Sequence, residues 1–171
     1  AFLLMVVFTV FTVITALSYN KQVIAHIGLV GAYAVPFLLS EGKGDVAVLY
    51  SYMAIINIGI LFIAFKKYWK PLYISSFVLT WLMFTSWYAS NYNADEYFGL
   101  ALVFVFIFFV TFYLTFLAYK LLQNEKFETL DILLLLANSF IFYGIGYGIL
   151  DSHEIGAQLL GVFTLFNAAI H

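Results

Sequence analysis

Apolar stretches of 16 to 23 residues follow one another along this 171-residue chain, and short polar segments separate them. Each stretch is about as long as the roughly 20 residues that a helix needs to cross a bilayer. Only 9% of the residues are charged, whereas a soluble domain averages about 25%, so the chain could not cover a folded surface in water. We therefore predict that lipid surrounds most of this protein.

Continuous apolar runs predict helices rather than the strands of a membrane barrel, in which roughly ten residues alternate in character. The expected fold is all-α, a polytopic transmembrane helical bundle of about seven spans, the last of them truncated. The predicted spans are Ala1–Ser18, Val23–Leu39, Val46–Phe65, Leu72–Ser90, Tyr97–Tyr119, Thr129–Leu150 and Ile155–Ile170. Because no proline-rich or strongly charged segment divides them, we treat residues 1–171 as a single helical module. The chain opens and closes inside apolar stretches, so we expect it to be a fragment of a larger membrane protein.

The lysines predict the orientation of the chain, since basic residues near span ends are retained on the cytoplasmic side. Six of the seven basic residues lie in the odd-numbered connecting segments, and these are Lys21, Lys66, Lys67, Lys70, Lys120 and Lys126. Only Lys43 lies in an even-numbered segment, where most of the acidic residues also lie. We therefore expect the odd-numbered loops to face the cytoplasm and residue 1 to lie outside.

Several kinds of chemistry find no support in the residue types present. The chain has no cysteine, which excludes disulfides and thiolate nucleophiles or ligands. All basic residues are lysines, and they form no patch that points to nucleic acid. His153-Glu154 lacks the second histidine of a zinc protease, and neither a nucleophile elbow nor a phosphate loop occurs. We expect no catalytic residue, no cofactor and no metal in this chain.

Ionisable residues inside a span often mark proton or ion paths, because burying an unpaired charge is expensive. Two residues come close to such a position. Asp131 lies about one turn into the sixth predicted span, and His26 lies near the start of the second. We predict a solvated, interfacial position for Asp131. For His26 we expect an interfacial or helix-bonded side chain rather than a metal ligand, since it has no second histidine or acidic partner at helical spacing.

Two amides, Asn57 and Asn138, are the polar residues that reach the middle of predicted spans. A buried amide needs hydrogen-bond partners, so we expect both to join neighbouring helices. The alternative is that they line a polar cavity together with hydroxyl groups that share a helix face, which are those of Thr9, Thr12, Thr111 and Thr115. Threonine also bonds its own helix backbone, and this favours packing over a cavity.

Small residues predict where helices approach closely. Gly144 and Gly148 form one small-xxx-small pair, and Gly28 with Ala32 forms another. Pro36 should kink the second helix near its outer end, because proline lacks the backbone N–H that the helix needs. Gly42 and Gly44 allow a sharp turn after it, and Asp45 is placed to cap the third helix.

A family resemblance rests on several of these motifs. They are the glycine spacing before Ala34-Val35-Pro36, the Ser40–Gly44 turn, Asn57 with Gly59, the aromatic and basic loop Lys66–Lys70, and Asn138-Ser139 followed by Tyr143–Tyr147. From about His26 onward the chain resembles the bacterial membrane proteins called domain of unknown function family 2339. The resemblance implies a bacterial cytoplasmic membrane and many further spans, and it supplies no activity.

Two hypotheses for function remain open. The first is a structural or assembly role, in which the chain is a helical module whose partners are the lipid bilayer and the remaining spans of the same polypeptide, with homo- or hetero-oligomers possible. The second is transport or lipid handling through a cavity near Asn57 and Asn138. The absence of charge in mid-span favours the first hypothesis.

Overall fold

The computed structural model describes residues 2–39 and 45–170, and in this part of the chain all regular structure is helical. The helices are α1 (Phe2–Tyr19), α2 (Gln22–Leu39), α3 (Val46–Ala64), α4 (Lys70–Asn91), α5 (Ala94–Leu122), α6 (Thr129–Asp151) and α7 (Glu154–Ile170). This confirms the predicted all-α fold. The helix boundaries also lie within three residues of the predicted ones.

Local sequence explains why helices begin and end where they do. The Asp45 side chain accepts a hydrogen bond of 2.8 Å from the backbone N–H of Ala47, which confirms the predicted cap of α3. Asn93 caps α5 in the same way, with the N–H of Asp95 as donor at 3.0 Å. Asn20 (φ 50°) and Asn124 (φ 52°) adopt the left-handed conformation just after α1 and α5, which asparagine tolerates better than most residues. The chain therefore turns sharply just after α1 and just after α5.

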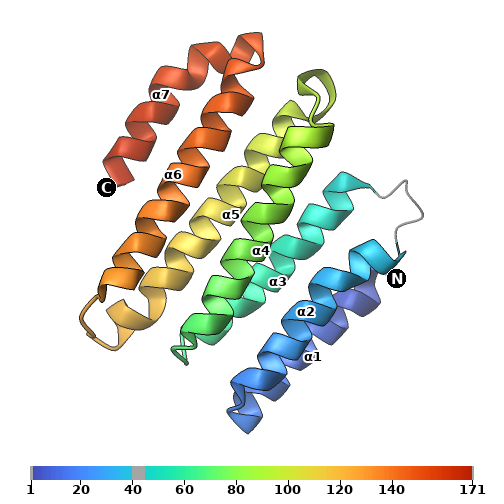
Figure 1. Cartoon of the computed structure of the whole chain (residues 1–171), viewed down its shortest axis with the longest axis vertical. Coiled ribbons are helices and arrows are strands. Elements are labelled where there is room, and N and C mark those ends of the chain that lie inside the picture. Colours follow the sequence, from blue (N-terminus) through green and yellow to red (C-terminus); the bar gives the residue numbers. More distant parts are fainter. Residues whose placement is uncertain (1, 40–44, 171) are drawn as a thin grey trace.

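The helices run up and down beside one another, so that successive helices are antiparallel (Figure 1). Helix α3 packs on α5, α5 on α6, and α6 on α7. Helices α1 and α2 pack on each other, and α1 also packs on α3. Helix α4 makes sparser contacts, but it touches α2, α3 and α5. As a result, side chains of α4 reach several neighbours at once.

Aromatic side chains fill the centre of the bundle. Phe84 of α4 and Phe108 of α5 are fully buried, with ring centroids 5.8 Å apart in an edge-to-face arrangement. Tyr50 of α3 joins them, at 5.1 Å from the Phe84 ring. Such pairs favour tilted or edge-to-face contacts at these separations. This cluster ties α3, α4 and α5 together.

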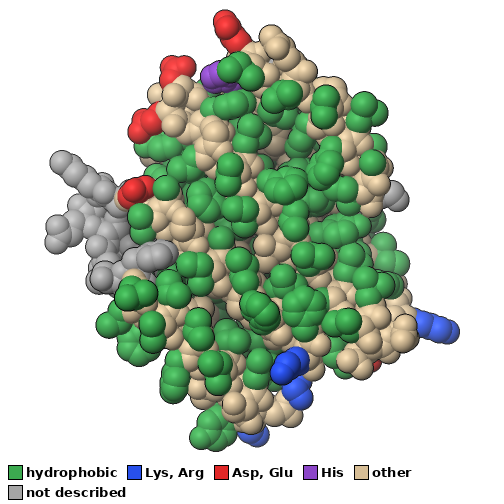
Figure 2. All heavy atoms as spheres, turned by 180° about the vertical axis from the view of Figure 1, so that it is seen from behind, with side chains coloured by type: hydrophobic (Ala, Val, Ile, Leu, Met, Phe, Trp, Pro, Cys, Tyr) green, Lys and Arg blue, Asp and Glu red, His purple; other side chains and the backbone are tan. Residues whose placement is uncertain are grey.

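The outer surface is mostly apolar, as a lipid-facing surface should be (Figure 2). Leu3, Phe140 and Leu165 each expose more than 70% of their surface. In the described residues, three helices are long and apolar enough to cross a membrane, and these are α3, α5 and α6. Length and composition therefore support membrane insertion, but they do not support the predicted count of about seven spans. Shorter apolar segments occur in α1, α2 and α7.

Candidate functional site

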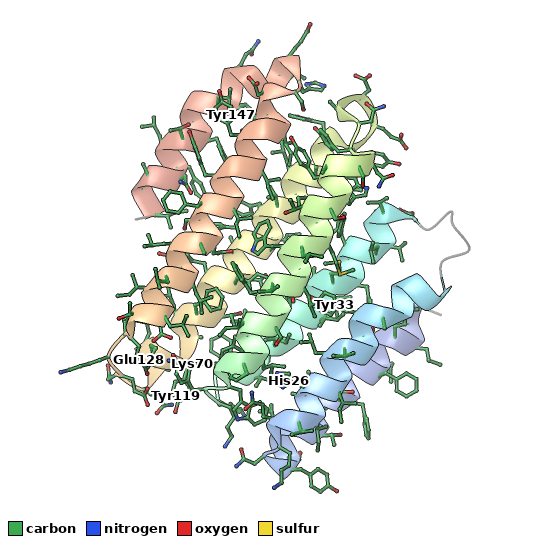
Figure 3. The ribbon with its side chains drawn as sticks, in the orientation of Figure 1. His26, Tyr33, Lys70, Tyr119, Glu128 and Tyr147 are labelled. Carbon is green, nitrogen blue, oxygen red and sulfur yellow. The ribbon has the colours of Figure 1, made fainter. Side chains whose placement is uncertain are left out.

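The amide of Asn57 lies at a junction of three helices. Its Oδ1 accepts a hydrogen bond of 2.9 Å from the Tyr33 hydroxyl of α2, and its Nδ2 donates one of 3.0 Å to Thr80 Oγ1 of α4. Thr80 in turn donates to the carbonyl oxygen of Ser76 at 2.7 Å. Asn57 and Thr80 are almost completely buried, and Tyr33 points into the bundle between its neighbours (Figure 3). These bonds join α2, α3 and α4.

The amide of Asn138 forms a second junction. Its Oδ1 accepts a hydrogen bond of 3.2 Å from Trp81 Nε1 of α4, and its Nδ2 donates one of 3.0 Å to the carbonyl oxygen of Phe109 in α5. Asn138 itself is fully buried. A carbonyl oxygen has two lone pairs, so Phe109 can accept this bond and still take part in its helix. The contact joins α4, α5 and α6.

The two junctions are adjacent along α4, because Thr80 and Trp81 are neighbouring residues. Each amide uses both its carbonyl oxygen and its NH₂ group in bonds to other helices. The structure thus brings Asn57 and Asn138 into two linked clusters of hydrogen bonds rather than into one common hollow.

The four candidate threonines bond mainly to their own helices. The hydroxyl groups of Thr12, Thr111 and Thr115 donate to the carbonyl oxygen four residues earlier, at 2.7–2.8 Å. Thr9 does the same at 3.0 Å, and its hydroxyl also lies 3.3 Å from that of Tyr52. Thr9 and Thr12 border a cavity of about 30 Å³ between α1, α2 and α3, which neither amide lines. This is the volume of roughly one water molecule.

The glycines of the two predicted close contacts have different surroundings. A Cβ added at Gly28 would overlap Cγ2 of Thr12, so α1 and α2 meet closely there, and Ala32 borders the same small cavity. A Cβ at Gly148 would overlap the Tyr88 hydroxyl. At Gly144 the corresponding position has no described atom within 4 Å. The side chain of Pro36 and the residues Gly42 and Gly44 lie outside the described part, so the kink and the glycine turn remain predictions.

A cluster of charged side chains, which the sequence did not predict, lies where α4 begins and where the α5–α6 loop folds back (Figure 3). We call it the ionic cluster. It consists of Lys70, Lys120, Glu125, Glu128 and Asp131, together with the ring of Tyr68. It links the ends of three helices at the lysine-rich end of the bundle.

At the centre of the ionic cluster, Lys120 and Asp131 expose only 3% and 4% of their surface. The Lys120 Nζ lies 3.7 Å from Asp131 Oδ2 and 3.2 Å from Glu125 Oε2. Lys70 reaches Glu128 at 2.6 Å and Asp131 at 3.7 Å, and the Tyr68 hydroxyl donates to Asp131 Oδ1. The prediction of a solvated position for Asp131 was therefore wrong. The α5 helix extends to Leu122, and this carries Lys120 inward against the start of α6.

The contacts within the ionic cluster raise the pKa values of two of its groups, Tyr68 and Lys70. Burial and the bond to Asp131 raise the pKa of the Tyr68 hydroxyl above its usual range. The hydrogen bond that Lys70 donates to the Glu128 carboxylate raises the pKa of Lys70, so that its ammonium form is favoured. A sequence signal for part of the cluster did exist, because Glu128 and Asp131 have the spacing of a helix start, and the Glu128 N–H donates to Asp131 Oδ2 at 2.9 Å.

Metal ligation has no geometric support in the described residues, since no three histidine, aspartate or glutamate side chains come together in a suitable way. His26 Nδ1 lies 3.2 Å from the carbonyl oxygen of Gln22 in its own helix. The two amide junctions and the ionic cluster are thus made of amides, hydroxyls, lysines and carboxylates that bond to groups of neighbouring helices.

A family model described as predicted membrane protein (DUF2339) matches residues 1–169. The chain belongs to this family. The match extends the resemblance seen from His26 onward to include the first helix. No curated protein and no solved structure matches this DUF2339 chain. The family places the protein in a membrane, in agreement with its apolar helices.

Proposed function

We propose that this DUF2339 chain is a structural module of a larger membrane protein, and that its buried amides hold helices together rather than handle a substrate. The observation that carries the proposal is that Asn57 and Asn138 are buried and satisfied by groups of neighbouring helices. Interhelical bonds of this kind contribute about 0.6–2 kcal/mol each in a bilayer. The proposal includes no catalytic step.

The ionic cluster supports the same role from the end of the bundle. A buried lysine and aspartate are stable only when they are paired, and here the pairing requires α4, α5 and α6 to be in their observed places. The two amide junctions and the ionic cluster together fix α4 against four other helices. We propose that these contacts hold the module in the arrangement in which it packs against the remaining spans of the polypeptide.

The distribution of charge supports an orientation in the membrane. The described lysines gather at the end of the bundle where α1, α3 and α5 finish, and the described acidic side chains outside the ionic cluster gather at the opposite end (Figure 2). We propose that the lysine-rich end faces the cytoplasm of a bacterial cell and that the protein lies in the inner membrane. Its partners are then the bilayer and neighbouring helices.

Transport is the competing function, and it requires a path for water or substrate past the amides. The experiment is to place single cysteines at Asn57 and Asn138 in the full-length protein, after removing any cysteine that the remaining sequence contains. A membrane-impermeant thiol reagent is then applied to native membranes, with cysteines at the exposed Glu96 and the buried Phe108 as positive and negative controls. We expect protection at 57 and 138. Labelling at both positions, to the extent seen at Glu96, would overturn the structural proposal and favour transport.

A further inference from the structure

An apolar groove of about 510 Å³ lies between α5, α6 and α7, and its lining includes neither amide and no residue of the ionic cluster. Its floor includes the buried side chains Val105, Phe142 and Leu150. Its walls include Phe106 of α5 and Val162 of α7, which are 46% and 66% exposed. The groove therefore opens sideways, toward the surface where lipid would lie.

Two pairs of aromatic rings connect the helices around the groove. Phe98 of α5, one helical turn before the lining residue Leu102, stacks on His153 in the α6–α7 turn, with ring centroids 4.3 Å apart. Phe106 and Phe166, which both line the groove, have ring centroids 5.8 Å apart. The lining residues of α6 run from Phe142 to Leu150, which is about 12 Å along a helix axis. The groove is therefore a short recess.

The dimensions of this recess fit an acyl chain better than a helix. One leaflet contributes about half of the roughly 30 Å hydrocarbon thickness, or about 15 Å, which is close to the length of the recess. A helix has a diameter of about 10–12 Å and needs an unobstructed path along the whole membrane. Since the lining extends over only about 12 Å of α6, a neighbouring helix could cross over the recess but could not lie in it through the whole membrane.

Charge at the rim indicates which lipid would place its chain there. Asp151 directly follows the groove residue Leu150, and Glu154 begins α7, and both acids are exposed. The described lysines all lie at the opposite end of the bundle. An anionic headgroup would thus meet like charge, whereas a headgroup that carries an ammonium group would meet opposite charge.

We propose that the groove between α5, α6 and α7 binds one acyl chain of a phospholipid with an ammonium headgroup, of the phosphatidylethanolamine type, with Asp151 and Glu154 beside the ammonium. The site lies in the leaflet at the acid-rich end of the bundle. The apolar floor accepts the chain, and the two carboxylates select the headgroup. This inference does not depend on the role of the amides.

The test is native mass spectrometry of the full-length protein after reconstitution with equal amounts of phosphatidylethanolamine and phosphatidylglycerol. Val162→Trp should fill the groove and remove the retained lipid. Val30→Trp is the matched control, because Val30 is 63% exposed on α2, far from the groove. We expect the wild-type protein and Val30→Trp to retain one phosphatidylethanolamine, and Val162→Trp to retain none.

A second variant keeps the groove intact and changes only the rim. Asp151→Asn combined with Glu154→Gln should lower the preference for phosphatidylethanolamine over phosphatidylglycerol by about fivefold or more, on the order of one charge interaction at a membrane surface. Wild-type protein that retains no lipid, or equal retention in Val162→Trp and Val30→Trp, would overturn the site. An unchanged headgroup preference in the double variant would overturn the assignment of the ammonium lipid.

Discussion

The pairing of Lys120 with Asp131 offers a sharp test of how the module is held together. Lys120→Met removes the ammonium group and keeps most of the apolar side chain. Asp131 would then remain buried with Lys70 at 3.7 Å, the Tyr68 hydroxyl and the Glu128 backbone N–H as its favourable neighbours. Removal of one partner from a buried pair costs about 3–5 kcal/mol. Because Lys70 still compensates part of the charge, we expect the lower end of this range, about 3 kcal/mol.

Thermal unfolding of the purified protein in mild detergent, followed by tryptophan fluorescence, measures this effect. For a domain of this size, about 3 kcal/mol corresponds to a fall in Tm of about 6–12 °C. The matched control is Lys126→Met, since Lys126 lies in the same loop region with an exposed side chain and should leave Tm within about 2 °C. Adding Asp131→Asn to Lys120→Met should recover much of the loss, because the neutral side chain no longer needs a counter-ion. Equal shifts for Lys120→Met and Lys126→Met, or no recovery in the double variant, would refute the reasoning.

Two further pairs of variants test individual contacts by the same unfolding measurement. Tyr33→Phe should lower the free energy of unfolding by about 1–3 kcal/mol, because it removes the hydroxyl group that donates to the buried Asn57 Oδ1. Tyr50→Phe should cost almost nothing, since the Tyr50 hydroxyl has no partner among the described residues. Gly28→Val should cost about 1–3 kcal/mol through overlap with α1, whereas Gly31→Val should be tolerated, since no described atom lies within 4 Å of its added Cβ. A loss for Tyr50→Phe as large as that for Tyr33→Phe, or for Gly31→Val as large as that for Gly28→Val, would contradict the observed packing.

The helices themselves could be predicted from the sequence because their causes are local. Apolar runs, the cap at Asp45 and the lysine clusters between runs are all visible in the order of residues. The sequence also predicts that Asn57 and Asn138 have hydrogen-bond partners, because an amide in an apolar stretch must be satisfied wherever it lies.

The identity of those partners could not be predicted, because it depends on which helices are neighbours. Tyr33, Thr80 and Trp81 carry no signal along the chain that distinguishes them from other aromatic and hydroxyl residues. The burial of Asp131 was missed for a related reason. Its solvation depends on Lys120 and Tyr68, which belong to other segments and reach it only when the loops fold together. Position along a helix is therefore a poor guide to burial near the ends of a membrane bundle.

A double-mutant cycle on Trp81 and Asn138 tests most directly whether the amides join helices. Trp81→Phe, Asn138→Leu and the double variant are compared by unfolding of the full-length protein in detergent, and the coupling energy is taken from the difference. The structural proposal predicts a coupling of about 0.6–2 kcal/mol, with each single variant less stable than the wild type. A coupling of zero within error would contradict it, because the two side chains would then act independently and the junction of α4 with α6 would not hold the bundle together.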